Sequence, residues 1–106
     1  MAFLDEAQHG FQTVKANYTS AQSAATLISA TSGKAIIVDK VLFSADTAGN
    51  MFLGSDSTQI SQKTYYGSNG GIAVDDWRLP CVTGENLKIT TILSGNHSIW
   101  VRYYLV

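Results

Sequence analysis

The stretch GKAIIVDKVLFSAD at residues 33–46 holds the longest run of β-favouring residues in the chain. Two apolar triplets, residues 36–38 and 41–43, flank the polar pair Asp39–Lys40. The stretch is apolar at positions of both parities, which is typical of a strand inside a sheet or between two packed surfaces. A charged pair in the middle of such a strand predicts either a β-bulge or a strand that passes from one packing environment to another.

Outward from this stretch, the chain alternates short β-favouring segments with turn residues such as Gly, Asn and Ser. No segment has the periodicity of a convincing helix. Together with residues 36–43, the expected strands are 12–18, 25–31, 50–54, 59–66, 72–77, 87–93 and 98–106. This layout predicts one all-β domain over residues 1–106, an antiparallel, jelly-roll-like β-sandwich of about eight strands.

Residues 1–11 precede the first expected strand and contain Phe3, Leu4, Ala7 and Phe11. Their spacing suits a short helical turn or an arm laid on another surface, but the segment is too short for a stable isolated helix. We therefore treat residues 1–11 as a candidate N-terminal interaction arm, with a locally packed terminus as the alternative.

The C-terminal hairpin gives the clearest local pattern. Residues 87–93 and 98–106 flank a turn at residues 94–96. The last strand is apolar or aromatic on both faces, so one face fills the core and the other forms an exposed patch unless a neighbour covers it. The expected inward set is Ile99, Val101, Tyr103 and Leu105. The residues predicted to form an interface are Phe3 and Phe11 of the arm, with Trp100, Tyr104 and Val106 of the last strand.

Charged residues make up 14% of the chain, and the net charge is −1. Soluble domains typically carry about 25% charged residues, so the composition favours a chain that hides much of its surface in an assembly. The absence of a basic run argues against nucleic acid as a partner. No apolar stretch reaches the ~18 residues of a transmembrane helix, so no membrane is expected. Because residues 1–10, MAFLDEAQHG, carry acids where a signal peptide carries bases, we expect retention in a cytosol.

Residues that bind metals are sparse and scattered. His9 and His97 stand alone in the sequence, so neither a metal site nor a cofactor is expected. The adjacent carboxylates of Asp75–Asp76 would point to opposite faces of a strand. A calcium site at the sandwich edge, drawn from Asp46, Asp56 or Asp75, stays open as the alternative.

No arrangement for nucleophilic catalysis is evident. A free, buried or half-buried Cys81 thiol is favoured over a Cys81–His97 pair. The glycine-rich residues 67–71 lack a following Lys-Ser/Thr and helix, which predicts a flexible hairpin tip and not a phosphate loop. No catalytic residue is assigned, and the chain is predicted not to be an enzyme.

The aromatic residues admit two interpretations. They would either stack on sugars in a lectin-like groove or fill the core and a subunit interface. The low charge of the chain favours core and interface. The residues concerned are Trp77, Trp100, Tyr65, Tyr66, Tyr103 and Tyr104.

Several short runs along residues 25–106 carry a resemblance to a known class of proteins. They are GKAIIV at 33–38 with FSA at 43–45, NGGIAV at 69–74, Leu79–Pro80, TGENLKIT at 83–90 and IWVRYYLV at 99–106. Their layout resembles small β-sandwich structural proteins of tailed phages, in particular capsid decoration or cement proteins. The first 20 residues lie outside the resemblance.

The resemblance implies a jelly-roll-like virion protein on the capsid surface, synthesised in the host cytoplasm. Such a subunit would assemble as a homotrimer and bind the major capsid protein of the shell. No catalytic residue is implied. Three alternatives stay open: a phage tail, baseplate or fibre component, a glycan-binding adhesion module of such a part, and a small hydrolase or lyase of the cupin type.

Overall fold

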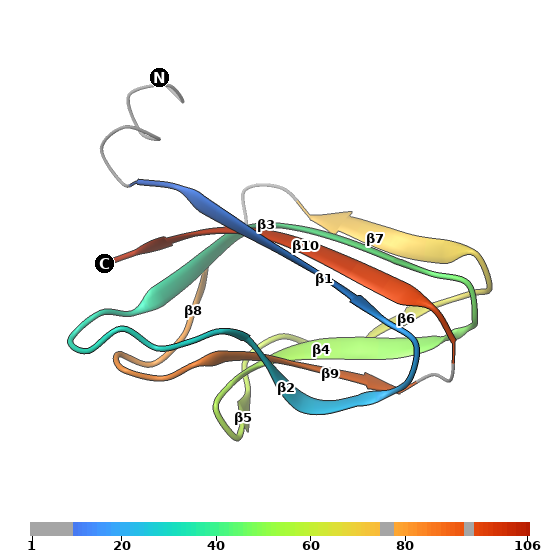
Figure 1. Cartoon of the computed structure of the whole chain (residues 1–106), viewed down its shortest axis with the longest axis horizontal. Helices are drawn as coiled ribbons and strands as arrows, with labels where there is room; N and C mark the ends of the chain where they lie inside the picture. The colour runs from blue at the N-terminus through green and yellow to red at the C-terminus, as the bar shows by residue number, and fades with distance from the viewer. Residues whose placement is uncertain (1–9, 75–77, 93–94) are drawn as a thin grey trace.

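The computed structural model describes residues 10–74, 78–92 and 95–106. All ten elements in these residues are β-strands, which form two antiparallel sheets packed face to face (Figure 1). The predicted all-β sandwich is therefore confirmed. The strands are β1 (Gln12–Tyr18), β2 (Gln22–Ile28), β3 (Ile36–Ala45), β4 (Gly49–Ser55), β5 (Thr58–Gln59), β6 (Thr64–Tyr66), β7 (Gly70–Val74), β8 (Leu79–Pro80), β9 (Leu87–Ile92) and β10 (His97–Leu105). Outside the described residues lie Phe3, His9, Asp75, Asp76 and Trp77.

The strand order is that of a jelly roll. The first sheet, called sheet I, has the order β1-β10-β3-β7, with β8 also beside β3. Sheet II has the order β2-β9-β4-β5, with β6 also beside β4. The connections β1–β2, β3–β4, β6–β7 and β9–β10 all cross between the sheets. β5 and β6 both pair with the same edge of β4, and β7 and β8 both pair with the same edge of β3. The ten short strands therefore fill the eight strand positions that a jelly roll of eight strands has.

Two expected strand boundaries are wrong. β2 covers Gln22–Ile28 and not residues 25–31, because the Ala30 N–H donates to the side chain of Asn86 (2.6 Å) and not to a neighbouring strand. The expected strand at 59–66 is broken into β5 and β6, because the N–H groups of residues 60 and 61 both donate to the carbonyl of residue 53. Hydropathy patterns do not reveal such individual bonds.

A β-bulge interrupts β3 in the middle of the stretch at residues 33–46. Lys40 lies opposite Arg102 of β10, whereas Val38 lies opposite the next residue, Tyr103. Asp39 is therefore the extra residue on β3, and the predicted bulge at Asp39–Lys40 is confirmed.

The bulge decides which residues of β3 face the core. Simple alternation placed Ile37 with Val41 and Phe43, and placed Ile36 and Val38 on the opposite face. In the structure Ile36 and Val38 join Val41 and Phe43 in the core cluster. Ile37 is buried outside that cluster. One extra residue thus reverses the in–out alternation for the first part of the strand.

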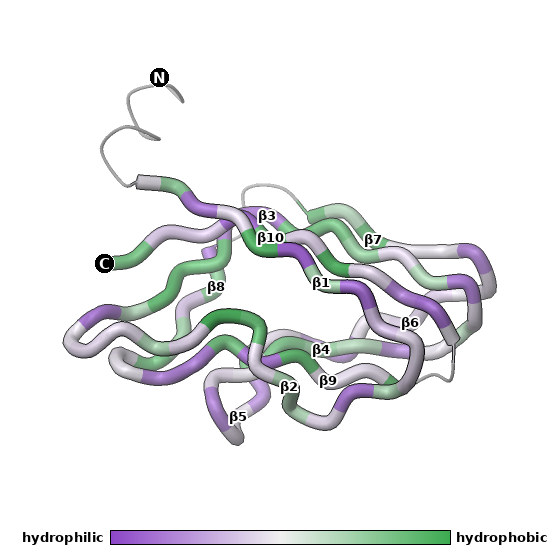
Figure 2. Tube along the Cα trace, viewed as in Figure 1, coloured by the Kyte–Doolittle hydropathy of each residue, from purple (hydrophilic) through white to green (hydrophobic). Residues whose placement is uncertain are grey.

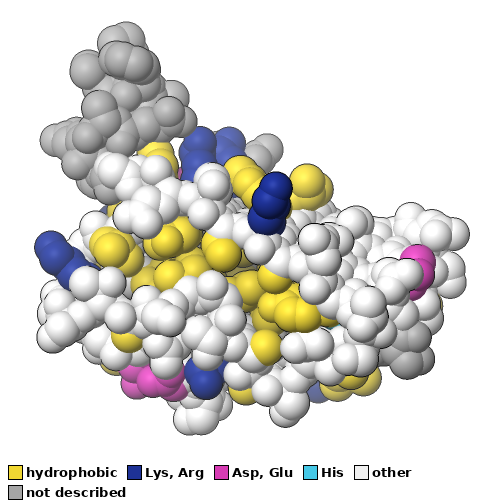
Figure 3. All heavy atoms as spheres, in the orientation of Figure 1, with side chains coloured by type: hydrophobic (Ala, Val, Ile, Leu, Met, Phe, Trp, Pro, Cys, Tyr) yellow, Lys and Arg dark blue, Asp and Glu magenta, His cyan; other side chains and the backbone are white. Residues whose placement is uncertain are grey.

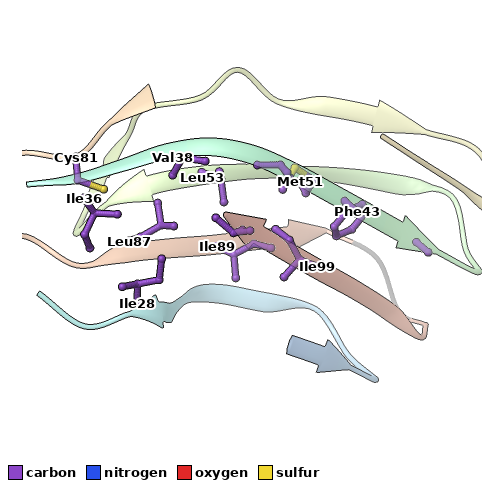
Figure 4. Close-up of a cluster of buried hydrophobic side chains, with 13 residues drawn as sticks. Ile28, Ile36, Val38, Phe43, Met51, Leu53, Cys81, Leu87, Ile89 and Ile99 are labelled. Carbon is purple, nitrogen blue, oxygen red and sulfur yellow. The ribbon is translucent and has the colours of Figure 1, made fainter. Parts of the chain in front are cut away.

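The core lies between the two sheets and is built from aliphatic residues of β3, β4, β9 and β10 (Figure 4). Hydrophobic residues occupy strands of both sheets, and along β1 they alternate with hydrophilic ones (Figure 2). Each fully buried aliphatic side chain stabilises the fold by about 1.5–3 kcal/mol. The expected inward set of the last strand is confirmed, since Ile99 and Val101 lie in the core and Tyr103 and Leu105 pack against it.

Candidate functional site

On one side of the sandwich, the strands that end the two sheets carry half-exposed hydrophobic side chains. β1 ends sheet I and β2 ends sheet II, and each pairs with one neighbour among the described strands. Hydrophobic side chains form a band across the surface on this side of the molecule (Figure 3). The half-buried residues that these strands contribute, here called the edge seam, are Val14 and Ala16 of β1 and Ala25 and Leu27 of β2.

Two properties of the edge seam suit it to a protein partner. An end strand presents a row of backbone N–H and C=O groups without a ladder partner, which another chain can pair with. Contiguous exposed hydrophobic surface on a small domain typically marks an interaction site. The sequence predicted the alternation of β1 but gave no indication that β1 and β2 would end their sheets, since strand order is a property of the whole fold.

Trp100 faces away from the core on sheet I, as the alternation in the last strand predicts. Its neighbours in register are Lys15 of β1 and Leu42 of β3. Trp100 is half-buried and Leu42 is 54% exposed, so both offer surface to a ligand or partner. A role of Trp100 in a subunit interface stays a prediction.

Three other predicted interface residues that the structure describes, Phe11, Tyr104 and Val106, lie near the start of β1 and the end of β10. Tyr104 is 5% exposed and contacts the Phe11 ring edge to face, with 5.3 Å between ring centroids. The Arg102 guanidinium lies 4.4 Å from the Phe11 ring centroid and forms an ion pair with Asp39. Val106 is exposed. The chain itself thus brings Phe11 and Tyr104 together, and their contact with a partner stays a prediction.

The outer face of sheet II also carries exposed hydrophobic residues. Tyr65 is 73% exposed and Ile92 is 54% exposed, and both lie in register with Asn50 of β4. Phe52 lies two residues further along β4 and is half-buried. The outward position of Ile92 follows from the alternation in residues 87–93, whereas Tyr65 lies in a segment whose pattern is weak.

The predicted chemical candidates are held apart. Cys81 is a buried free thiol, which confirms the preferred interpretation. It follows β8 beside Ile36, whereas His97 lies opposite Ala45, so the length of β3, roughly 30 Å, separates them. Asp56 and Asp46 are separated in the same way. Asp56 accepts a hydrogen bond from Asn86 in the loop near Cys81, whereas Asp46 lies at the other end of β3. In residues 10–74, 78–92 and 95–106, no three His, Cys, Asp or Glu residues cluster as metal ligands.

His97 has a structural environment that the sequence did not reveal. Its ring lies near Tyr18 and Phe43, with centroids 5.2 Å and 6.0 Å away. Nε2 is 3.0 Å from Thr91 Oγ1 of sheet II, and Nδ1 is 2.9 Å from the Gly95 carbonyl oxygen. Donation from Nδ1 to that carbonyl leaves Nε2 to accept from the Thr91 hydroxyl. The ring therefore joins the two sheets inside the core.

A hollow of about 520 Å³ opens at one end of sheet I, where the β1–β2, β3–β4, β6–β7 and β9–β10 connections meet. Each connection contributes one polar residue, namely Thr19, Asp46, Asn69 and Asn96. A second hollow, of about 170 Å³, lies on the outer face of sheet I beside Trp100. The sequence placed Asp46, Asn69 and Asn96 in turns, and the fold brings these turns together with Thr19.

Comparisons with known proteins give little further information. No family model and no curated protein matches the chain. Among solved structures, the chain is similar to one in the cryo-EM structure of a virus-like particle of extra small virus from the giant freshwater prawn Macrobrachium rosenbergii. The TM-score is 0.40 at 15% identity, over 90% of this chain and 77% of that one. Likeness of this degree carries no argument about function. No helix in the described part of the chain is long and apolar enough to cross a membrane.

Proposed function

We propose that this chain is a non-enzymatic structural subunit of a virus particle, a capsid decoration protein that forms a homotrimer on the shell. The observation that carries the proposal is the edge seam, a hydrophobic band that the described residues of the chain leave half-exposed. The sequence resemblance to phage decoration proteins supplies the kind of assembly.

Burial of the edge seam supplies a physical reason for assembly. Removing apolar surface from water stabilises by roughly 25 cal/mol per Å². A specific interface needs about 1,000 Å² or more of buried surface in total. The band lies along one side of the molecule, between two strands that are free to pair, so a neighbouring subunit would cover side chains and backbone groups together.

The jelly-roll connectivity is compatible with this role. Viral capsid and lectin domains both use it, so the fold alone supports the proposal by analogy and does not select between functions.

The two kinds of contact that a decoration protein needs fall on different parts of this chain. We assign the edge seam to contacts between subunits of the trimer. Phe11 and Val106, with Phe3 of the arm, lie toward the chain ends and are assigned to the major capsid protein. Binding to the folded shell would stabilise that shell by mass action. Synthesis takes place in the host cytoplasm, and the functional location is the capsid surface.

The test is the stoichiometry and position of the protein in purified virus particles. Quantitative mass spectrometry should find it in a fixed ratio to the major capsid protein, and cryo-EM should show trimers on the outer shell surface. Absence from the particles contradicts the virion role. A ring of six or twelve copies in the tail would contradict decoration and favour a tail, baseplate or fibre component. One observation favours a glycan-binding module of such a part, namely the polar hollow where the crossing connections meet.

A further inference from the structure

We propose that the two hollows of sheet I form one groove that binds a neutral oligosaccharide. The hollows share Asn17, Ser44 and Ser98, so a ligand can extend from one into the other. The larger hollow, about 520 Å³, falls within the roughly 300–1,000 Å³ of sites that hold small organic ligands. On β1 the groove residues Lys15 and Asn17 alternate with the edge-seam residues Val14 and Ala16, so they lie on the opposite face of that strand. This inference does not depend on the proposed function.

The lining of the larger hollow matches a polyhydroxylated ligand. Hydroxyl and amide side chains both donate and accept hydrogen bonds, as sugar hydroxyls do. They are Asn17, Thr19, Ser44, Asn69, Asn96 and Ser98. The carboxylate of Asp46 lies among them, with no Lys or Arg in the lining. An anionic group bound in the larger hollow would meet this carboxylate without a compensating cation, because Lys15 lines only the smaller hollow. The larger hollow therefore favours an uncharged ligand.

Several of these polar groups are free to bind a ligand. The side-chain amides of Asn69 and Asn96 make no hydrogen bond to the described part of the chain. Ser98 Oγ donates to Asn17 Oδ1 (2.6 Å), which leaves the amide N–H groups of Asn17 as donors. Thr47 Oγ1 donates to Asp46 Oδ1 (2.9 Å), which leaves the second carboxylate oxygen as an acceptor.

The connections that carry these groups are held in place before any ligand binds. The Asp46 N–H donates to the Asn96 carbonyl (3.0 Å), which ties the β3–β4 connection to the β9–β10 connection. Asn69 has a left-handed backbone (φ 55°) in a turn closed by a 3.1 Å bond between the Gly70 N–H and the Gly67 carbonyl. A preorganised site loses less entropy on binding.

Trp100 gives the groove an apolar wall. It lines the smaller hollow together with Leu42 and Lys15. Sugar rings present an apolar C–H face as well as hydroxyls, and a half-buried indole offers a flat, rigid surface for such a face. The groove therefore combines hydrogen-bonding groups at one end with an aromatic wall at the other, which is the chemistry that an oligosaccharide needs.

The test is binding of the full chain to an array of neutral, sialylated and sulfated oligosaccharides, followed by calorimetric titration with the best neutral ligand. Trp100→Ala should weaken binding about tenfold or more, and Asn96→Ala about fivefold, because each loses one main contact. Trp100→Phe retains an aromatic wall and should stay within about threefold of the wild type. Tyr65→Ala removes an exposed aromatic ring from sheet II and should leave binding unchanged.

Any of four results would overturn the proposal. One is binding to no neutral oligosaccharide on the array. Another is a preference for the sialylated or sulfated ligands. The third is equal affinity of wild type, Trp100→Ala and Asn96→Ala, which would place the sugar elsewhere. Circular dichroism and sedimentation of each variant show whether a loss reflects unfolding or a broken oligomer. If Trp100→Ala only breaks the oligomer while Asn96→Ala binds normally, Trp100 is an interface residue and the groove is refuted.

Discussion

Gly71 is a residue at which the fold leaves no room for a side chain. It pairs with Ser44 in the β7–β3 ladder, and a Cβ there would lie 2.0 Å from the backbone carbonyl oxygen of Phe43. We expect Gly71→Ala to lower the free energy of unfolding by about 1–3 kcal/mol, because β7 must move away from β3. Urea denaturation measures this loss.

The matched control is Gly67→Ala in the connection just before β7, where a Cβ would meet nothing within 4 Å. Its effect should stay within about 0.5 kcal/mol. Equal losses in the two variants would contradict the close approach of β7 to β3. The sequence predicted a loop from these glycines, but only the paired backbone shows which glycine is required.

Cys81 gives the fold a sensitivity to alkaline pH. The pKa of its thiol is raised from 9.0 to about 11, mainly by burial and in smaller part by the charges of Glu85 and Asp56, against a hydrogen bond with Ser55 that lowers it. The unfolded thiol ionises from about pH 9 while the native thiol stays protonated. The contribution of the protonated thiol to the free energy of unfolding is therefore complete below pH 9, and it is lost as the pH rises toward 11.

We therefore expect wild type to lose about 1–2 kcal/mol more than Cys81→Ala between pH 8 and pH 11. Urea denaturation across this range measures the difference. Burial also raises the pKa values of Tyr18 and Tyr66, but these act equally in both proteins. Parallel pH profiles would show that the thiol is not held in its protonated form.

At the scale of the element, the bulge at Asp39 sets the register of β3. Deleting Asp39 should turn Ile36 and Val38 away from the core and cost about 3–6 kcal/mol, since each buried side chain contributes about 1.5–3 kcal/mol. Asp39→Asn keeps the residue count and should cost about 1–2 kcal/mol through its weakened bonds to Arg102. Thermal denaturation measures the stability of both variants. A deletion variant as stable as Asp39→Asn would contradict a role of Asp39 in setting the register of β3.

The strands show how far local pattern predicts structure. Strong alternation predicted the inward and outward faces of β9 and β10, and the misplaced polar pair predicted the bulge. The weak alternation at residues 59–66 wrongly predicted one continuous strand, because the N–H groups of Ile60 and Ser61 both donate to the Leu53 carbonyl. Bonds between residues distant in the sequence, such as Ala30 to Asn86, lie outside any local pattern.

At the scale of the whole molecule, the sequence predicted the sandwich but not its candidate sites. The low charge of the chain and the strands that are apolar on both faces indicated a second buried surface outside the core. That prediction rested on the last strand, where Tyr104 proves to be covered within the chain by Phe11. The edge seam and the polar groove both depend on strand order, which brings β1 beside β2 and brings four of the connections between the sheets to one end of the sandwich.

Sedimentation velocity of the full chain over a wide concentration range tests most directly whether assembly buries the edge seam. We expect a trimer for wild type and for the control Tyr65→Ser on sheet II. We expect a shift to monomer for Leu27→Asn and Val14→Asn, with far-UV circular dichroism showing that both variants stay folded. A wild-type chain that remains monomeric throughout, or folded seam variants that remain trimeric, would contradict the claim.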